Sequence, residues 1–225
     1  MSALSRRQAL AGLGSVSLGA LIAACSDDDP ESARVETTDG TSSSFDDAAT
    51  CKLTAEQTEG PFYFDVDRIR SDIREDREGA ELRLGIRVRD ASDCTPLPDA
   101  VVDVWHCDAE GSYSAEGESY LRGAQVTNRE GVVEFTTVYP GWYPGRTVHI
   151  HAKVHLDKET VLTTQFYFDD AFSARVFTKD DAYPGESNRD GFNASDGLYD
   201  KDLELTLSEE RDGYSGLITL DVERA

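Results

Sequence analysis

The amino-acid sequence predicts an all-β fold, an antiparallel β-sandwich with long loops and little helix. Six or seven short apolar or alternating segments are separated by turns rich in Gly, Pro, Asn and Asp, which is the usual pattern of strands in a sandwich. Convincing amphipathic patterns of three helical turns or more are missing from the same stretch. Both observations favour two packed sheets over a helical or mixed fold.

The predicted strands differ in how their apolar residues are arranged. Residues 81–90 alternate between aliphatic side chains and arginines, as in a strand with one buried face. Residues 100–107 are more continuously apolar, as expected of a strand covered on both sides. Residues 169–198 are polar and rich in Gly, Asp and Asn, so we expect a long surface loop with a short helix near 171–177. Further strands are predicted at 131–138, 147–156, 160–168, 203–207 and 216–222.

The first 25 residues are expected to be a targeting segment and not a part of the fold. Arg6 and Arg7 precede an uncharged run of small and apolar residues from 9 to 24, which is typical of a twin-arginine export signal. The run ends in Ile-Ala-Ala-Cys25, similar to a lipobox, which makes Cys25 a candidate for lipidation. An ordinary signal with a chance cysteine is the alternative. The sequence thus predicts either a cell-surface lipoprotein or a secreted protein.

Residues 26–50 predict a flexible acidic linker ahead of a globular domain at 51–225. The linker holds eight acidic residues and few sizeable apolar ones, so it cannot bury enough surface to fold. The whole chain carries a formal net charge of −22. Nucleic acid and anionic lipid are therefore poor partners for its surface, and any membrane contact is expected only through the lipid anchor.

Three cysteines fall in the globular domain, and an odd number in an exported chain leaves one thiol over. Cys94 and Cys107 bracket a turn-rich stretch and a strand, so a Cys94–Cys107 disulfide is our first expectation, with Cys51 left over. No Cys-x-x-Cys pair occurs, which argues against a structural zinc site.

The pair His149 and His151 is the strongest chemical signal in the chain. Residues 147–156 alternate, so both imidazoles project from the same face of a predicted strand. Residues two apart on a strand are separated by roughly 6.5 Å, which allows both rings to reach one metal ion, whereas His155 is too far along the strand, at about 13 Å. For an isolated pair of this kind, two histidines on a solvated sheet face is the competing interpretation.

Two tyrosines in glycine-bearing turns extend this pattern. Tyr113 lies in A-E-G-S-Y-S, and Tyr143 lies in G-W-Y-P-G, six residues before His149. Phenolate oxygens are hard anionic donors that favour a trivalent ion, and two of them with two neutral imidazoles suit Fe(III) with an open position for water or substrate. A phenol ionises near pH 10 in water, so a strongly charged metal is needed to keep both deprotonated.

With these residues in place, the chain resembles the intradiol ring-cleavage dioxygenases, the non-haem iron(III) family of catechol and protocatechuate dioxygenases, and within it the exported single-domain branch. The resemblance extends from about residue 51 to 222. Four motifs carry it: T-E-G-P-F-Y (58–63), D-V-W-H-C-D-A-E-G-S-Y (103–113), Y-P-G-R-T-V-H-I-H (143–151) and T-Q-F-Y-F (164–168). It implies that O2 cleaves the ring of a catechol-type substrate between the two hydroxyl-bearing carbons, giving a cis,cis-muconate-type diacid.

The resemblance also implies roles for individual residues. The iron ligands it implies are Tyr113, Tyr143, His149 and His151, with Tyr143 as the ligand that substrate displaces. Arg146 matches an arginine that stabilises negative charge on the substrate ring, a role that suits a guanidinium because it does not lose its proton. Gln165 matches a glutamine near the same pocket. The remaining candidates line the pocket or its entrance: Pro61, Tyr63 and Trp105.

Some positions depart from the family pattern, and some alternatives stay open. His106, Cys107 and Gly145 stand where the intracellular enzymes often carry other residues, which predicts a pocket of different shape, and we expect His106 to pack or hydrogen-bond beside the site. A non-catalytic binding lipoprotein of the same fold is the main alternative, followed by a copper or zinc enzyme that uses only the two histidines. Which catechol is cleaved is open, and so is the oligomeric state, with a homodimer as one option.

Overall fold

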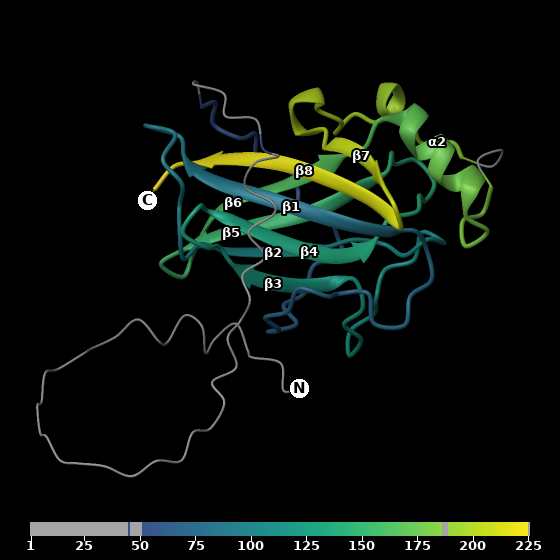
Figure 1. Cartoon of the computed structure of the whole chain (residues 1–225), viewed down its shortest axis with the longest axis horizontal. Helices are drawn as coiled ribbons and strands as arrows, with labels where there is room; N and C mark the ends of the chain where they lie inside the picture. Colours follow the sequence, from purple (N-terminus) through teal and green to yellow (C-terminus); the bar gives the residue numbers. More distant parts are fainter. Residues whose placement is uncertain (1–44, 46–50, 186–188, 225) are drawn as a thin grey trace, which may run out of the picture.

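The computed structural model describes residue 45 and residues 51–185 and 189–224 (Figure 1). The predicted export signal at 1–25 with Cys25 lies outside the described residues, as does the predicted linker at 26–50 apart from Phe45. The elements in chain order are β1 Glu81–Asp90, β2 Val101–Trp105, β3 Arg122–Val126, β4 Val132–Val138, β5 His149–Leu156, β6 Glu159–Tyr167, α2 Asp170–Lys179, the 3-10 turns η3 Asn193–Ser195 and η4 Lys201–Leu203, β7 Thr206–Glu210 and β8 Gly213–Val222.

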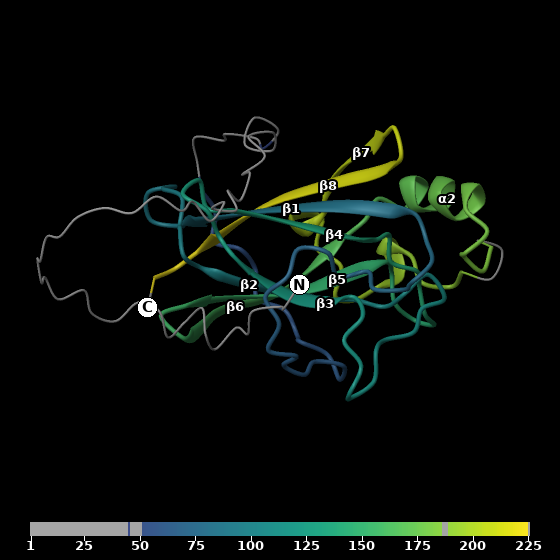
Figure 2. The same cartoon turned by 60° about the horizontal axis from the view of Figure 1, so that its bottom comes forward.

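The strands form two four-stranded sheets that lie face to face, which confirms the predicted sandwich (Figure 2). One sheet has the order β4-β1-β8-β7 and the other has the order β3-β2-β5-β6. Neighbouring strands are antiparallel with one exception, because β1 and β8 run parallel over nine register pairs from Leu82–Tyr214 to Asp90–Val222. A parallel pair needs a long connection between its strands, and here strands β2 to β7 and helix α2 all lie between β1 and β8.

The core lies between the two sheets and is built by the strand alternation seen in the sequence. The four aliphatic side chains of β1 are fully buried, and so are four in and just before β5, whereas Leu156 at the end of β5 is partly buried. Each fully buried valine, leucine or isoleucine side chain stabilises the fold by about 1.5–3 kcal/mol relative to exposure. The side chains in question are Leu82, Leu84, Ile86 and Val88 on β1, and Val148, Ile150, Ala152 and Val154 on the β5 side.

The outer face of the second sheet is covered by a segment that we call the N-terminal strap, residues 51–64. The strap follows the edge strand β6, where the backbone N–H of Gln57 donates to the carbonyl of Thr163 at 2.7 Å. It then passes over β5 and β2, with Gly60 against His151 and Tyr63 against Trp105. Because of this cover, both faces of β5 are buried, so the competing interpretation of two histidines on a solvated sheet face is wrong.

The predicted Cys94–Cys107 disulfide is also wrong. The structure joins Cys51 to Cys94, with the two Cα atoms 5.4 Å apart, and leaves Cys107 as a buried free thiol. Cys107 follows β2 into the core, where its Sγ lies 3.6 Å from the carbonyl oxygen of Gly141. The disulfide therefore attaches the beginning of the strap to the turn that follows β1.

The long stretch after β6 holds the predicted short helix, which spans Asp170–Lys179. Asp169 caps it by accepting a hydrogen bond from the backbone N–H of Phe172. Phe172, Val176 and Phe177 bury one face of the helix against the core. Within the described part of the chain, the structure contains no helix with the length and hydropathy of a transmembrane span.

Candidate metal centre and active site

The four predicted metal ligands come together on the outer face of the second sheet. His149 and His151 project from β5 with their ring centroids 4.9 Å apart. The hydroxyl oxygens of Tyr113 and Tyr143 lie 3.4 Å and 3.1 Å from Nε2 of His149. Tyr113 arrives on the loop after β2, and Tyr143 arrives on the loop before β5. Side chains from three separate segments thus converge on one point.

The ring of His149 is oriented by its own strand. Nδ1 lies 2.7 Å from the carbonyl oxygen of Thr147, so this nitrogen carries the proton and Nε2 presents its lone pair to the two tyrosine hydroxyls. Burial, followed by the positive charge of Arg146, lowers the pKa of His149 to about 4. Neutral imidazole is the form that binds a metal, so the free site already holds His149 in the binding state.

His151 is held by packing. Its ring stacks on Trp105, with centroids 5.0 Å apart and the planes 8° apart. Gly60 of the strap also packs closely on this ring, since a Cβ there would meet Cε1 of His151 at 3.2 Å. Burial and then the neighbouring His149 lower the pKa of His151 well below its usual value. Its Nδ1 is buried and has no hydrogen-bond partner among the described residues, and buried polar atoms of that kind are uncommon.

The two tyrosines need a cation if they are to ionise. Burial is the main reason that the pKa of Tyr113 lies well above its usual value and that the pKa of Tyr143 is raised as well. No group of three or more His, Cys, Asp and Glu side chains able to hold a metal occurs among the described residues. The donors that converge here are two tyrosine oxygens and two histidine nitrogens, a set that fits Fe(III).

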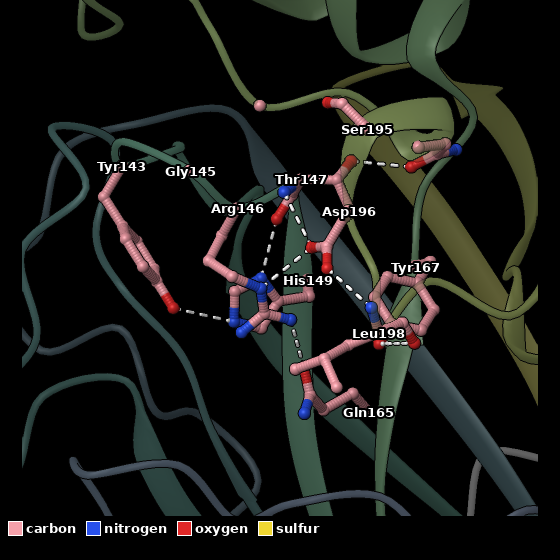
Figure 3. Close-up of polar contacts among 12 residues, drawn as sticks. Tyr143, Gly145, Arg146, Thr147, His149, Gln165, Tyr167, Ser195, Asp196 and Leu198 are labelled. Atoms are coloured by element: carbon pink, nitrogen blue, oxygen red, sulfur yellow. Dashed lines mark hydrogen bonds and ion pairs between the residues drawn. The ribbon is translucent and has the colours of Figure 1, made fainter.

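Arg146 and Gln165 lie beside this cluster and bind each other. Nη2 of Arg146 donates to Oε1 of Gln165 at 2.6 Å, and its Nε donates to Oδ2 of Asp196 at 2.8 Å (Figure 3). Gln165 in turn donates from Nε2 to the carbonyl of Thr58 in the strap at 2.9 Å. The guanidinium is thereby held at the edge of the cluster with a defined orientation.

The three predicted pocket residues differ in their exposure and contacts. Pro61 is exposed on the strap. Tyr63 packs on Trp105 and donates its hydroxyl to Oδ2 of Asp103 at 3.2 Å, while the Lys153 ammonium lies 3.5 Å from its ring centroid. Trp105 is only 1% exposed and supports His151 from behind. Of the three, Pro61 is the one that lies open to solvent.

The predicted set omits several residues that contact the site. Phe62 is 41% exposed and stacks on Tyr113, with ring centroids 4.4 Å apart and the planes 13° apart. Phe62 lies between Pro61 and Tyr63 in the T-E-G-P-F-Y motif (58–63), and this position could have identified it as a site residue. Arg122, from the unpredicted strand β3, donates from Nε to Ser114 Oγ at 2.5 Å and so fixes the neighbour of Tyr113. A lone arginine in a short polar strand gave no sequence signal for this role.

His106 hydrogen-bonds in the interior. Its Nε2 lies 2.6 Å from Thr137 Oγ1, and its Nδ1 lies 2.7 Å from the carbonyl oxygen of Cys107. The residue is 0% exposed. Neither ring nitrogen is directed to the tyrosine and histidine cluster, since both have other partners.

The fold and the cluster together define a class of protein, a β-sandwich with a two-tyrosine, two-histidine centre on the outer face of one sheet. Residues 58–181, more than half of the chain, match the family model described as Dioxygenase. The chain belongs to the intradiol ring-cleavage dioxygenase family.

Individual relatives agree with this membership. The chain is 33% identical to a chlorocatechol 1,2-dioxygenase of Rhodococcus opacus over 121 residues, which cover 43% of this chain and 47% of that protein. It is 30% identical to catechol 1,2-dioxygenase 1 of Acinetobacter lwoffii over 137 residues, which cover 48% of this chain and 44% of that protein. The matched part thus spans about half the length of these curated relatives.

Two solved structures match more of the chain. An intradiol ring-cleavage dioxygenase from Tetranychus urticae is 31% identical, with a TM-score of 0.73 over 77% of this chain and 95% of that chain. The dioxygenase domain of a dioxygenase carbohydrate-binding protein fusion from Streptomyces sp. SirexAA-E is also 31% identical, with a TM-score of 0.62 over 77% of this chain and 100% of that chain.

Proposed function

We propose that the protein is an iron(III)-dependent intradiol dioxygenase. Its substrate is a catechol-type aromatic, cleaved by O2 between the two hydroxyl-bearing carbons to a cis,cis-muconate-type diacid. The observation that carries the proposal is the convergence of Tyr113, Tyr143, His149 and His151, with both tyrosine hydroxyls within 3.4 Å of one imidazole nitrogen. Membership of the family and the names of the catechol and chlorocatechol dioxygenase relatives support it.

The four side chains would hold the iron. When bound, a ferric ion supplies the Lewis acidity that draws electron density from a catecholate and prepares the ring for reaction with O2. The chain supplies a fixed donor set, since Thr147 orients His149 and Trp105 backs His151. It also supplies neutral imidazoles, so these ligands need not lose a proton before binding.

The two tyrosines have different freedom to move. Tyr143 lies on a loop whose next two residues, Pro144 and Gly145, are exposed. Tyr113 is covered by the ring of Phe62, and the loop that carries it is held by Arg122 through Ser114. Tyr143 is therefore the tyrosine that can leave the centre when substrate enters, and its Oη can then receive a proton from a substrate hydroxyl.

Arg146 stabilises the anionic substrate. Its guanidinium stays protonated, and hydrogen bonds to Asp196 and Gln165 fix its direction. A fixed positive charge beside a ring that accumulates negative charge costs no reorganisation at the moment of reaction. A local arginine also attracts an anionic aromatic at short range, where the net negative charge of the chain is screened by salt.

The test is O2 uptake by the iron-loaded protein against a panel of catechol, chlorocatechols, protocatechuate and hydroxyquinol. We expect uptake with at least one of them, and isotopically labelled O2 should place both oxygen atoms in a ring-opened diacid. Arg146→Ala should reduce kcat by roughly a hundredfold, as for loss of one preorganised electrostatic donor. An iron-loaded protein that binds catechols without consuming O2 would instead be a binding protein, and the proposal would fail.

The proposal includes the location of the protein. The twin-arginine signal at 1–25 would export it, and Cys25 would carry a lipid anchor unless the protein is released. The Cys51–Cys94 disulfide supports export, because disulfides persist outside the reducing cytosol. Fractionation and mass spectrometry of the full chain test this. If the wild type is a lipoprotein, it should be found in the membrane fraction with the mass of a lipid added. The Cys25→Ser variant should lack that added mass and leave the membrane fraction. A wild-type chain found reduced in the cytosol would contradict it.

A further inference from the structure

The carboxylate of Asp196 binds three donors next to the proposed centre. Its Oδ2 accepts from Nε of Arg146 at 2.8 Å and from the backbone N–H of Thr147 at 3.0 Å (Figure 3). Its Oδ1 accepts from the backbone N–H of Leu198 at 2.9 Å. The side chain is 3% exposed. Asp196 is thus an inward-facing carboxylate within an otherwise largely exposed loop, and both of its oxygens are bound.

Its two Oδ2 bonds reach two different parts of the site. One fixes the guanidinium of Arg146, whose Nη2 continues to Gln165. The other holds the peptide N–H of Thr147, and the carbonyl of that same residue accepts from Nδ1 of His149 at 2.7 Å. A single oxygen atom therefore links the residue that stabilises substrate charge to the orientation of a metal-binding ring.

The loop that carries Asp196 is held in place by other contacts. A Cβ at Gly191 would lie 1.9 Å from the carbonyl oxygen of Arg146, so the loop backbone packs directly on the Arg146 peptide. Asn193 accepts from the Thr147 hydroxyl at 2.6 Å and donates from Nδ2 to the carbonyl of Phe168 at 2.9 Å. These contacts hold the loop independently of the bond between Asp196 and Arg146. A carboxylate that is already held in place can orient the guanidinium.

We propose that Asp196 is a positioning residue of this site, which fixes the Arg146 guanidinium and, through the Thr147 peptide, the His149 ring relative to each other. The proposal rests on the proposed function, because the purpose of this geometry is to place a positive charge beside metal-bound substrate. Asp196 does not touch the reacting atoms. It acts through Arg146 and Thr147.

Steady-state kinetics of iron-loaded variants test the proposal. Asp196→Ala should lower kcat by roughly 10- to 100-fold, the usual effect of losing a partner that orients a metal-site residue. Asp196→Asn keeps an oxygen that can accept the Oδ2 bonds, so it should retain an intermediate kcat. The matched control is Asp180→Asn, in the same stretch of chain, where the carboxylate makes the same kind of i to i+2 turn bond to Ala182 N but contacts neither Arg146 nor Thr147. This control should keep wild-type kcat.

A double-mutant cycle separates positioning from a general structural role. If Asp196 acts partly through Arg146, the fold loss of kcat caused by Asp196→Ala should be smaller once Arg146→Ala is present, because coupled residues are not additive and only the contact through Thr147 is then left to lose. Equal fold losses of kcat in the wild-type and Arg146→Ala backgrounds would overturn the proposal. So would a loss of kcat in Asp180→Asn that equals the loss in Asp196→Asn.

A second readout does not depend on activity. In metal-free protein, the Nε–H of Arg146 should give a slowly exchanging NMR signal in the wild type and in Asp180→Asn, and a rapidly exchanging one in Asp196→Ala. If the three proteins show this pattern of exchange but the iron-loaded wild type consumes no O2, the proposed function is refuted and the Asp196 bond to Arg146 is still established. A protected Arg146 signal that survives Asp196→Ala would refute the positioning role even in an active enzyme.

Discussion

The close contact between Gly60 in the strap and His151 predicts that a side chain at position 60 disturbs the metal-binding ring. Gly60 has a φ of +69°, and a Cβ there would lie 3.2 Å from Cε1 of His151, closer than an ordinary van der Waals contact. His151 has little room to move, because its ring is stacked on Trp105 and both side chains are only 1% exposed. Gly60→Ala should therefore displace a metal-binding ring as well as strain the backbone.

Gly117 supplies the matched control. It also has a positive φ, +96°, but a Cβ there would meet nothing within 4 Å. Backbone strain from a left-handed alanine costs roughly 1–2 kcal/mol, so each variant should lose about 2–8 °C in Tm at this domain size. Only Gly60→Ala should also weaken Fe(III) binding, by about tenfold.

The assays are thermal unfolding of the metal-free variants and competition for Fe(III) with a coloured chelator. We expect similar losses of Tm in the two variants and a lower affinity for Fe(III) in Gly60→Ala alone. Equal Fe(III) affinities for Gly60→Ala and Gly117→Ala, measured on folded protein, would refute the claim that the strap packs on a metal-binding ring.

Two further predictions concern stability. Removing the disulfide with Cys51→Ser and Cys94→Ser should lower the free energy of unfolding by about 4 kcal/mol, given a sequence separation of 43 residues. Denaturant unfolding under non-reducing conditions measures this loss. An unchanged unfolding midpoint would contradict the pairing of Cys51 with Cys94. His106 gives a pH dependence, because burial lowers its pKa from 6.5 to about 4. The unfolded chain then takes up the proton first as the pH falls, so this contribution to the free energy of unfolding is complete above about pH 6.5 and is lost toward pH 4, with a slope of up to about 1.4 kcal/mol per pH unit. In His106→Gln the pH dependence in that window should be flatter by up to this slope, and identical slopes would show that the ring is not held neutral.

Local patterns in the sequence were sufficient to predict most of the strands and the histidine pair, although the strand expected at 203–207 is found at Thr206–Glu210, after the 3-10 turn that ends at Leu203. Side-chain alternation follows from strand geometry, so residues 81–90 and 147–156 could be assigned without knowledge of their neighbours. Because His149 and His151 are two residues apart on a strand, their spacing also predicts that both side chains project from the same face. Strand β3 was not predicted, because Arg122–Val126 is short and includes Gly123, whose missing side chain leaves room for Ile73.

Features that depend on distant parts of the chain were not accessible in this way. The strap buries the outer face of β5 through contacts between residues about 90 or more positions apart, such as Gly60 with His151 and Gln57 with Thr163. The pairing of Cys51 with Cys94 likewise depends on how two distant segments of the chain fold together. Asp196 could not be distinguished in the sequence from the many other acidic residues of an acidic chain, since its role depends on the loop that turns it toward Arg146.

Visible absorption of the iron-loaded protein tests most directly whether two phenolic oxygens bind one ferric ion. The wild type should show a tyrosinate-to-iron charge-transfer band. Tyr113→Phe and Tyr143→Phe should each weaken or shift it, and the double variant should lose it. Tyr199→Phe is the control, because that hydroxyl donates to Glu204 at 2.7 Å and is not part of the cluster. A fully iron-loaded wild type without the band, or a band that persists in the double variant, would contradict the account.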